Sequence, residues 1–303
     1  MQWKGVMPAM TTPFDENLKV DWPFVKRHAR WLHANGCSGI VCLGSLGEAA
    51  TLTFDEKIRI VCDVVDAVSP AIPVVGAVSA LSTIEAVNLA KALADAGAQG
   101  LMILPPYVYR GDWRETKAHI AAILRATPLP AMLYNNPVAY GTDFIPEQIS
   151  ELADEFGNLA AVKESSTDVR RVTAIRALSN NRLAIFVGVD DAIVEGIDAG
   201  AVGWIAGLVN AFPRESVELF DIAKRGDKQS AFDLYRWFLP LLRMDTVPKF
   251  VQLIKLVQEE IGIGSARVRP PRLQIEGAEL AETKRLVAEA VRSHPKTYTS
   301  SAL

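Results

Sequence analysis

The 303-residue sequence has no excess of charge of either sign, since 32 Lys and Arg residues oppose 35 Asp and Glu residues. The formal net charge of -3 gives no electrostatic footprint for nucleic acid or for an anionic membrane surface. No run of 18 apolar residues occurs, so we expect no membrane-spanning helix. The N-terminus has no apolar stretch ahead of a cleavage site, and a signal peptide is therefore not expected.

Cysteine is scarce as well. The three cysteines, Cys37, Cys42 and Cys62, are odd in number and lack the paired spacing of disulfides or zinc sites. We therefore expect reduced thiols and a cytoplasmic protein. The four histidines are scattered, and His28 and His33 share one amphipathic segment where packing or solvation is expected rather than metal binding.

Apolar residues make up 50% of the chain, enough to fill a large core, and many of them cluster in eight short runs. The runs are continuous rather than alternating, which is typical of parallel strands covered on both faces. Their spacing is that of repeated strand–helix units. The eight expected strands are residues 5–11, 39–44, 73–79, 100–106, 130–137, 159–166, 183–191 and 200–210.

The segments between these runs carry helix signals. Thr53 and Glu56 have the spacing of a capping box, and the helix that follows is expected to place Cys62 on its apolar face. A second helix is expected between a Ser/Thr cap near residue 82 and a stop at Gly97.

Eight strand–helix units predict an α/β fold, the (β/α)8 TIM barrel, which leaves no strand edge exposed. An open doubly wound sheet is the alternative. It calls for a glycine-rich turn after the first strand, where the sequence has MTTPFDENL. After residue 211 the pattern changes to long helical segments. We therefore expect the barrel over residues 1–225 and a helical extension packed on it over residues 226–303.

The sixth expected strand contains a lysine, in the stretch NLAAVKESSTD. Burying an ammonium group is costly unless it is paired or neutralised. Near the open end of a barrel strand, desolvation lowers the pKa of a lysine, and a neutral amine can attack a carbonyl group to form a Schiff base. The alternatives are a lysine on a surface loop and a lysine paired with Glu164. The strand-end position and two nearby tyrosines favour a reactive Lys163.

Other candidate residues lie where the strands end, which is where such barrels carry their catalytic groups. Tyr107 and Tyr134 each end a strand and could either shuttle protons or cap the core, and Ser45 could link their phenols. The GSLGE turn at residues 44–48 could offer backbone N–H groups to a carboxylate. Asp190 and a second aspartate, Asp191, follow Gly188, and they could contact substrate hydroxyls or cap the next helix.

Taken together, these residues resemble the family of class I aldolases and lyases that includes dihydrodipicolinate synthase and N-acetylneuraminate lyase. The resemblance spans residues 1–300 and is carried by five motifs in order: PAMTTPF, GSLGE, YNNP, VKES and GVDD. It implies that Lys163 forms the Schiff base with a 2-oxo acid and that Tyr134 is the general acid and base. It also implies a proton relay through Ser45 and Tyr107, with Tyr107 reaching in from the partner subunit.

The same resemblance implies a homotetramer built from tight dimers, with no metal and no organic cofactor. The N–H groups of Ser45 and Leu46 are expected to hold the substrate carboxylate, and the carbonyl of Ile205 is expected to face the site. The full set of expected substrate-binding residues is Thr11, Leu46, Asn136, Gly188, Asp190 and Ile205.

Two positions depart from the dihydrodipicolinate synthases. Ala139 stands where those enzymes carry an arginine that binds a distal carboxylate, so a bidentate partner is missing. Leu46 stands where they carry a hydroxyl-bearing residue. Both departures favour a catabolic member that catalyses elimination instead of condensation.

The expected reaction is therefore the dehydration and deamination of 1-pyrroline-4-hydroxy-2-carboxylate to 2-oxoglutarate semialdehyde. Alternatives within the family are a dehydratase or aldolase of 2-keto-3-deoxy sugar acids and a synthase-like pyruvate aldolase. A barrel that only senses a 2-oxo acid is the non-enzymatic alternative, and the intact set of lysine, tyrosines and serine argues against it. A metal-dependent aldolase would need histidine ligands at strand ends, and no histidine lies there.

Overall fold

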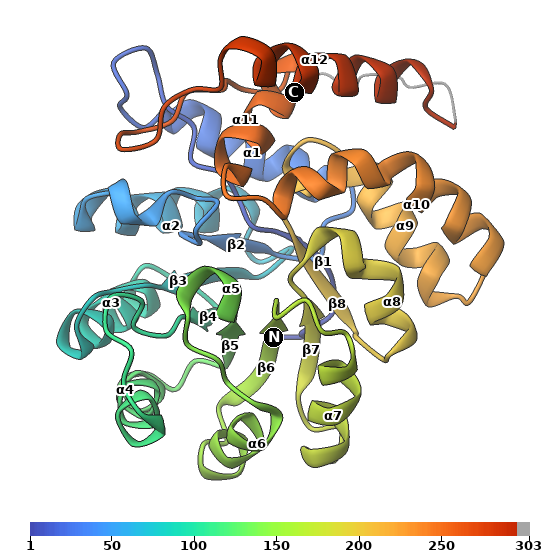
Figure 1. The fold of residues 1–303 in the computed structure, drawn as a ribbon. Coiled ribbons are helices and arrows are strands. Elements are labelled where there is room, and N and C mark those ends of the chain that lie inside the picture. The colour runs from blue at the N-terminus through green and yellow to red at the C-terminus, as the bar shows by residue number, and fades with distance from the viewer. Residues whose placement is uncertain (296–303) are drawn as a thin grey trace.

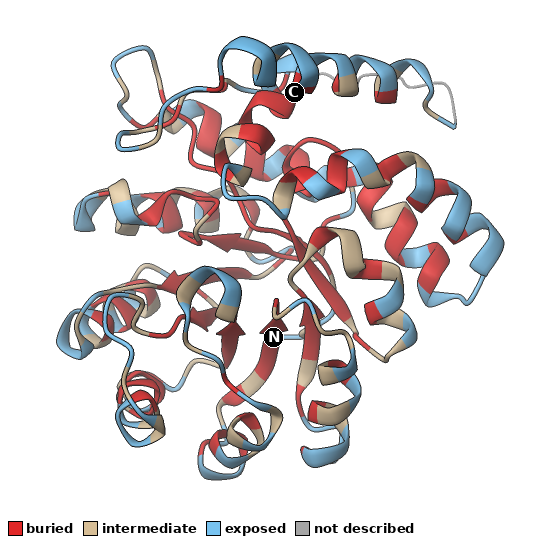
Figure 2. Ribbon diagram, in the orientation of Figure 1, coloured by how far each residue is buried: buried red, intermediate tan, exposed pale blue. Residues whose placement is uncertain are grey.

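Eight short parallel strands form the centre of the structure, a computed structural model that describes residues 1–295 (Figure 1). The strands are buried almost throughout, as their continuous apolar runs predict (Figure 2). Each strand lies inside one of the eight expected runs. The strands are β1 (Gly5–Pro8), β2 (Ile40–Cys42), β3 (Val74–Val78), β4 (Gly100–Ile103), β5 (Ala131–Asn135), β6 (Leu159–Glu164), β7 (Ala184–Val187) and β8 (Gly203–Ala206).

The strands pair in their sequence order, and the circle closes between the first two. Strand β1 pairs with β8 along its length, with Gly5 opposite Gly203. On its other side, Ala9 forms a single bridge with Val41, and the N–H of Met10 donates to the carbonyl of Val41 at 2.8 Å. The fold is therefore the predicted (β/α)8 barrel, and the open-sheet alternative is wrong.

Helices connect successive strands and cover the outside of the barrel (Figure 1). The α-helices of the described residues are α1 (Trp22–Ala34), α2 (Phe54–Val68), α3 (Thr83–Asp95), α4 (Trp113–Ala126), α5 (Pro137–Tyr140), α6 (Pro146–Glu155), α7 (Arg170–Leu178), α8 (Ile193–Asp198), α9 (Pro213–Lys224), α10 (Lys228–Leu242), α11 (Phe250–Glu260) and α12 (Gly277–Arg292). Short 3₁₀ helices are η1 (Ala49–Thr51), η2 (Asp190–Ala192), η3 (Leu208–Asn210) and η4 (Arg243–Asp245).

The helix signals of the sequence are found at the expected residues. The N–H of Thr53 donates to the carboxylate of Glu56 at 2.9 Å, and the Thr53 hydroxyl accepts from the Glu56 N–H at 3.2 Å. This reciprocal pair confirms the capping box in front of α2. Ser82 caps α3 by accepting from the N–H of Glu85, and the helix stops just ahead of Gly97, which has a φ of +90°.

The cysteines differ in exposure. Cys37 and Cys42 are buried, and burial raises the pKa of each thiol to about 12, so both stay protonated. Cys62 is exposed, so its expected place on the apolar face of α2 is wrong. Because α2 packs against α1, α3 and β3, its buried face is centred elsewhere, on Ile60, Val61, Val64 and Val68.

The C-terminal helices pack on one another and on the barrel. Helix α11 lies against α12 and η4, and the hydroxyl of Thr11, just after β1, donates to Gln258 of α11 at 2.9 Å. The expected boundary at residues 225 and 226 falls in the turn between α9 and α10, where Gly226 has a φ of +77°. The division into two units stays a prediction, and residues 296–303 of the expected extension lie outside the described residues. Within residues 1–295, no helix has both the length and the apolar character needed to cross a bilayer.

One histidine is part of the core. His28 of α1 is fully buried between the rings of Phe24 and Trp31, with centroid distances of 5.4 and 5.9 Å. Its Nε2 lies 3.1 Å from the carbonyl of Asn210, and the neutral ring donates a hydrogen bond there. Burial lowers the pKa of His28 from 6.5 to about 4. The expected packing role of this histidine is thus observed.

This burial predicts a pH dependence of stability. The unfolded chain takes up a proton on His28 as the pH falls through 6.5, whereas the folded protein resists it until about pH 4. Stability is therefore fully present above pH 6.5 and is lost as the pH falls, by about 2 kcal/mol between pH 7 and pH 5. Urea unfolding at both pH values measures this loss, which should shrink in His28→Gln and persist in a variant of the exposed His33, His33→Gln. Equal losses in wild type and His28→Gln would contradict the assignment.

Candidate active site

Lys163 lies on β6 with its side chain enclosed and its amine unpaired. The residue is 6% exposed, and no hydrogen bond or ion pair joins its Nζ atom to another of the described residues. Nζ lies 4.3 Å from the ring centroid of Tyr134, which is opposite Lys163 on the neighbouring strand β5. Desolvation lowers the pKa of the Lys163 amine, opposed in part by the acidic groups of Asp245, Tyr140 and Asp190 nearby. A buried amine with a lowered pKa is a nucleophile toward carbonyl carbons.

Glu164 is not the partner of this lysine. Successive strand residues point to opposite faces, so the two side chains diverge. The Glu164 carboxylate accepts from the amide of Asn135 at 3.0 Å and from the N–H of Ser166 at 2.6 Å. The paired alternative for Lys163 is therefore wrong.

Glycine at position 188 leaves room for the lysine. A Cβ atom built on Gly188 would lie 2.6 Å from Cε of Lys163 and 2.0 Å from the hydroxyl oxygen of Ser165, closer than atoms can approach. The Ser165 oxygen is enclosed and has no hydrogen-bond partner in the part of the chain that the structure describes. Gly188 thus borders the amine as expected, and its contribution is space rather than a side chain.

Tyr134 is held by its neighbour Asn136. The Asn136 amide donates to the phenol oxygen at 3.0 Å, and its carbonyl oxygen accepts from the N–H of Ala139 at 3.0 Å. Burial raises the pKa of the Tyr134 phenol, so the group is protonated at neutral pH. Asn136 therefore orients the phenol beside Lys163 and caps α5 at the same time.

Tyr140, at the end of α5, is a residue that the sequence analysis missed. Its hydroxyl contacts the hydroxyl of Ser45, and its ring centroid lies 5.7 Å from that of Tyr134 and 6.1 Å from that of Tyr107. Burial raises the pKa of the Tyr140 phenol. Ser45 was expected to link Tyr134 and Tyr107. In the structure its hydroxyl partner is Tyr140, because the turn of α5 brings this ring between the other two. The position of Tyr140, one residue after Ala139 in the motif region, is the sequence feature that could have indicated its role.

The GSLGE turn presents its backbone toward the end of the barrel. The N–H groups of Ser45 and Leu46 donate to no acceptor within residues 1–295, although the Glu48 N–H closes the turn on the Ser45 carbonyl at 3.1 Å. The side chain of Leu46 is buried, with 3% exposed. Two free N–H groups in one turn form a nest of the kind that binds carboxylates, so their expected role stays a prediction that the geometry permits.

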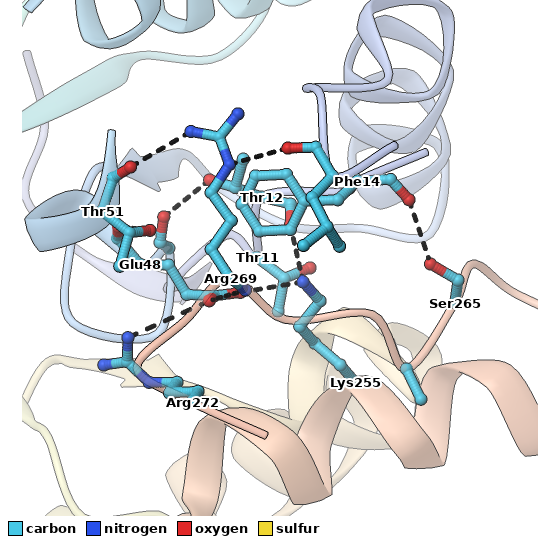
Figure 3. A network of polar contacts seen from close by, with 12 residues as sticks. Thr11, Thr12, Phe14, Glu48, Thr51, Lys255, Ser265, Arg269 and Arg272 are labelled. Carbon is cyan, nitrogen blue, oxygen red and sulfur yellow. Dashed lines mark hydrogen bonds and ion pairs between the residues drawn. The ribbon is translucent and has the colours of Figure 1, made fainter. Parts of the chain in front are cut away.

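A buried charge network fixes this turn from behind (Figure 3). Lys255 of α11 donates to the carboxylate of Glu48 at 2.8 Å and to the carbonyl of Thr12 at 2.9 Å. The second oxygen of Glu48 accepts from the N–H of Arg269 at 3.0 Å, and Arg272 lies 3.9 Å away. Glu48 has a φ of +55°, a strained conformation for a residue other than glycine. The C-terminal helices therefore hold the turn in its shape.

Two expected substrate ligands are committed to other contacts. Asp190 is fully buried, and its carboxylate accepts from the indole of Trp204 and from the N–H groups of Gly207 and Leu208 at 2.9–3.2 Å. Thr11 donates its hydroxyl to Gln258. Both side chains are therefore already hydrogen-bonded within the protein, and the expected substrate contact of each stays a prediction. Ile205 lies on β8 opposite Met7, and the role of its carbonyl stays a prediction.

Asp245 is a second residue that the sequence analysis missed. It belongs to η4, which the C-terminal region places over the end of β8, and its carboxyl oxygen lies 1.9 Å from where a Cβ of Gly207 would stand. It is also near enough to Lys163 to act on the pKa of the amine. No motif around Asp245 pointed to the barrel end, because its position depends on how α10 and α11 pack.

Arg110 lies near Ala139, the position where the dihydrodipicolinate synthases carry an arginine. The guanidinium of Arg110 rests on Gly141, whose Cβ would come within 2.2 Å of the guanidinium carbon. Arg110 is exposed and follows Tyr107 in the loop after β4. A guanidinium thus lies beside the α5 turn, although residue 139 is alanine.

Comparison with known proteins connects the chain to one family. A sequence model of the dihydrodipicolinate synthetase family matches residues 2–290. A 4-hydroxy-tetrahydrodipicolinate synthase of Methanocaldococcus jannaschii is 28% identical over 289 residues, which cover 95% of this chain and 97% of that protein. The enzyme of the same name from Nitrosococcus oceani is 32% identical over 78% of this chain and 81% of its own length.

Solved structures agree. A putative dihydrodipicolinate synthetase from Pseudomonas aeruginosa superimposes with a TM-score of 0.91 at 29% identity, over 95% of this chain and all of that one. The Escherichia coli protein YagE, solved in complex with pyruvate, gives a TM-score of 0.90 at 25% identity over 96% of this chain and 99% of its own.

The contact between the hydroxyl groups of Ser45 and Tyr140 predicts that loss of the Tyr140 hydroxyl slows Schiff-base formation. Tyr140→Phe removes the hydroxyl and should slow formation of a borohydride-trappable adduct between pyruvate and Lys163 by about 10-fold or more, because a proton carrier is lost. Tyr109→Phe is the matched control, since the exposed Tyr109 hydroxyl donates to the carboxylate of Glu115 at 3.1 Å, away from Ser45 and Lys163. Adduct formation at the wild-type rate in Tyr140→Phe would show that the contact carries no proton.

The network around Glu48 predicts a stability effect. Lys255→Met leaves the Glu48 carboxylate buried without its cation and should lower the free energy of unfolding by about 3–5 kcal/mol. Adding Glu48→Gln removes the uncompensated charge and should recover part of the loss, as a double-mutant cycle in urea measures. The control is Lys284→Met, which breaks a partly exposed pair with Glu260 at 2.9 Å and should cost below about 1 kcal/mol. Equal losses at the two lysines would contradict the argument.

Proposed function

The chain belongs to the dihydrodipicolinate synthetase family and is an enzyme of the class I aldolase and lyase type, and from this premise we propose that it dehydrates and deaminates 1-pyrroline-4-hydroxy-2-carboxylate. The product is 2-oxoglutarate semialdehyde, and the reaction proceeds through a Schiff base on Lys163. The observation that carries the proposal is the enclosed, unpaired amine of Lys163 beside the phenol of Tyr134.

The first step is attack of the neutral Lys163 amine on C2 of the cyclic imine. The ring C2–N bond then breaks, and the ring nitrogen leaves as an amine after taking a proton from the phenol of Tyr134. A buried phenol supports this role, because a raised pKa makes its conjugate base strong. The C2 carbon is left joined to Lys163 as a protonated Schiff base, and Tyr134 is left as a phenolate.

The second step uses that Schiff base as an electron sink. The Tyr134 phenolate takes a proton from C3, which regenerates the phenol and gives an enamine, and the enamine expels the hydroxyl group from C4. Elimination leaves a C3=C4 double bond beside the amine on C5, and proton transfers from C5 to C3 and from that amine to C4 convert it into an imine at C5. Water then hydrolyses the two C=N bonds, at C2 and at C5, and frees ammonia, the Lys163 amine and the product. Ser45 and Tyr140 lie next to Tyr134 and offer hydroxyl groups that can pass protons to and from it.

The substrate carboxylate is proposed to bind the free N–H groups of Ser45 and Leu46. Backbone donors suit a single carboxylate, and the alanine at position 139 supports a substrate with no second one. As in its relatives, the substrate is a small molecule. A homotetramer with Tyr107 reaching the partner's site, and a cytoplasmic location, are carried here as proposals that rest on the family resemblance.

Arg110 favours a second candidate. Its guanidinium rests on Gly141 and could hold a distal carboxylate in place of the missing arginine. The chain would then be a pyruvate aldolase, like the 4-hydroxy-tetrahydrodipicolinate synthases among its relatives. YagE was solved in complex with pyruvate, which supports a 2-oxo acid as the group that reacts with lysine in either case.

Parallel assays distinguish these functions. The wild-type enzyme should form 2-oxoglutarate semialdehyde and ammonia from the pyrroline substrate, while 2-keto-3-deoxy sugar acids, and pyruvate with aspartate semialdehyde, turn over at least about 100-fold more slowly. Borohydride reduction should trap the adduct on Lys163, and Lys163→Ala should lose both trapping and turnover. Lys249→Ala is the control, since Lys249 pairs with Glu279 on the surface.

Three results would count against the proposal. Trapping on a lysine other than Lys163 would refute the residue assignment. Faster condensation of pyruvate with aspartate semialdehyde, lost in Arg110→Ala, would establish the second candidate. Binding of 2-oxo acids without turnover of any substrate would favour the sensor barrel.

A further inference from the structure

The carboxyl group of Asp245 is buried near Lys163, and the steps described above give it no role. Its Oδ1 atom is enclosed and has no hydrogen-bond partner among the described residues. The segment that carries it is well fixed: Arg243 lies 3.6 Å from the carboxylate of Asp191, and Thr246 folds back on the carbonyl of Arg243 at 2.9 Å. Met244, between them, is buried. An enclosed polar atom without a partner calls for an explanation.

Glycine at position 207 makes the approach of this carboxyl possible. A Cβ atom on Gly207 would lie 1.9 Å from Oδ1 and 2.5 Å from Cγ of Asp245, so no other residue fits there. The N–H of the same glycine donates to Asp190 at 3.2 Å. Asp245 and Asp190 therefore flank Gly207, one against its Cα and the other on its N–H. Lys163 is close enough to both for its charge to act on them.

The two carboxyls differ in how well each can carry a negative charge. Asp190 accepts hydrogen bonds from Trp204, Gly207 and Leu208, which stabilise its anion. Asp245 has no such donor among residues 1–295, and both burial and the charge of Asp190 raise its pKa well above the ordinary value. When the two share protons, the one without donors keeps its proton. The charged groups acting on Asp245 are Lys163, Asp190 and Asp191.

We propose that Asp245 is the general acid that protonates the hydroxyl group leaving from C4 of the substrate, a role that rests on the function proposed above. In this step the enamine nitrogen on Lys163 forms a C=N bond, the C2=C3 pair becomes C3=C4, and the C4–O bond breaks. The oxygen takes the Asp245 proton and departs as water. Nitrogen gains a positive charge while Asp245 gains a negative one, so an ion pair forms inside the site where none existed.

The direction of the proton also decides between two reactions of a 4-hydroxy-2-oxo acid. Retro-aldol cleavage begins when the C4 hydroxyl loses its proton to a base. Elimination requires that the same oxygen gain a proton. Because Asp245 lacks the N–H donors that stabilise the anion of Asp190, it is the carboxyl of the two that holds a proton to donate, so Asp245 favours elimination. The substrate class assigned to the site is therefore a 2-oxo acid, or its cyclic imine, with a hydroxyl group on C4.

The test compares leaving groups that do and do not need a proton. Asp245→Asn should lower kcat for the 4-hydroxypyrroline substrate by about 100-fold or more, with little change in KM, because the amide cannot give up a proton. With chloride in place of the 4-hydroxyl, the leaving group departs as an anion, and the variant should keep a rate within about 3-fold of wild type. Asp233→Asn, on the exposed face of α10, is the matched control and should leave both rates unchanged.

Trapping with pyruvate separates this proposal from the one it rests on. Asp245→Asn should still form the borohydride-reducible adduct on Lys163 at the wild-type rate. If wild type traps pyruvate and eliminates the hydroxyl group, but Asp245→Asn does so equally well, Asp245 is not the acid. Equal loss of the hydroxyl and chloride reactions in the variant would mean a structural role and would also overturn the proposal. A wild-type enzyme that cannot use the pyrroline substrate refutes the proposed function itself.

Discussion

The geometry of the site depends on a buried ion pair that contains none of the reacting groups. Lys255 and Glu48 meet at 2.8 Å with side chains that are 1% and 0% exposed. Glu48 ends a turn whose backbone is strained at both ends, since Leu43 has a φ of +66° and Glu48 one of +55°. Without the pair, the turn would be free to relax, and the N–H groups of Ser45 and Leu46 would lose their shared direction.

Two buried lysines serve opposite purposes in this fold. Lys255 has a carboxylate and a carbonyl as partners and packs 4.4 Å from the ring centroid of Phe14. Lys163 has an aromatic face beside it but no hydrogen-bond acceptor in the described part of the chain. The same desolvation acts on both amines, yet only the unpaired one keeps its lone pair available for a carbon atom. Reactivity here follows from the absence of a partner, not from burial alone.

The sequence alone was sufficient to predict those parts of the molecule that are determined by local residue patterns. The eight strands follow from continuous apolar runs, and Lys163 and Tyr134 follow from their places at strand ends. Asp190 looked like a ligand by the same rule, but the N–H groups around it could not be foreseen. Tyr140 and Asp245 escaped because a helical turn and the packing of distant helices bring them to the site. Electrostatic interactions between residues 80 or more positions apart, such as that of Asp245 with Lys163, leave no periodic pattern in a single sequence.

The chain is synthesised from its N-terminus, and this order determines when the C-terminal residues of the site become available. The residues of all eight strands, with Lys163 on β6 among them, have been synthesised once Ala206 has been added. Asp245, Lys255 and Arg269 are synthesised only afterwards. A nascent chain with a finished barrel therefore still lacks the cation that fixes the Glu48 turn. Its reactive amine is synthesised before the rest of the site, which is complete only after Arg269 has been added.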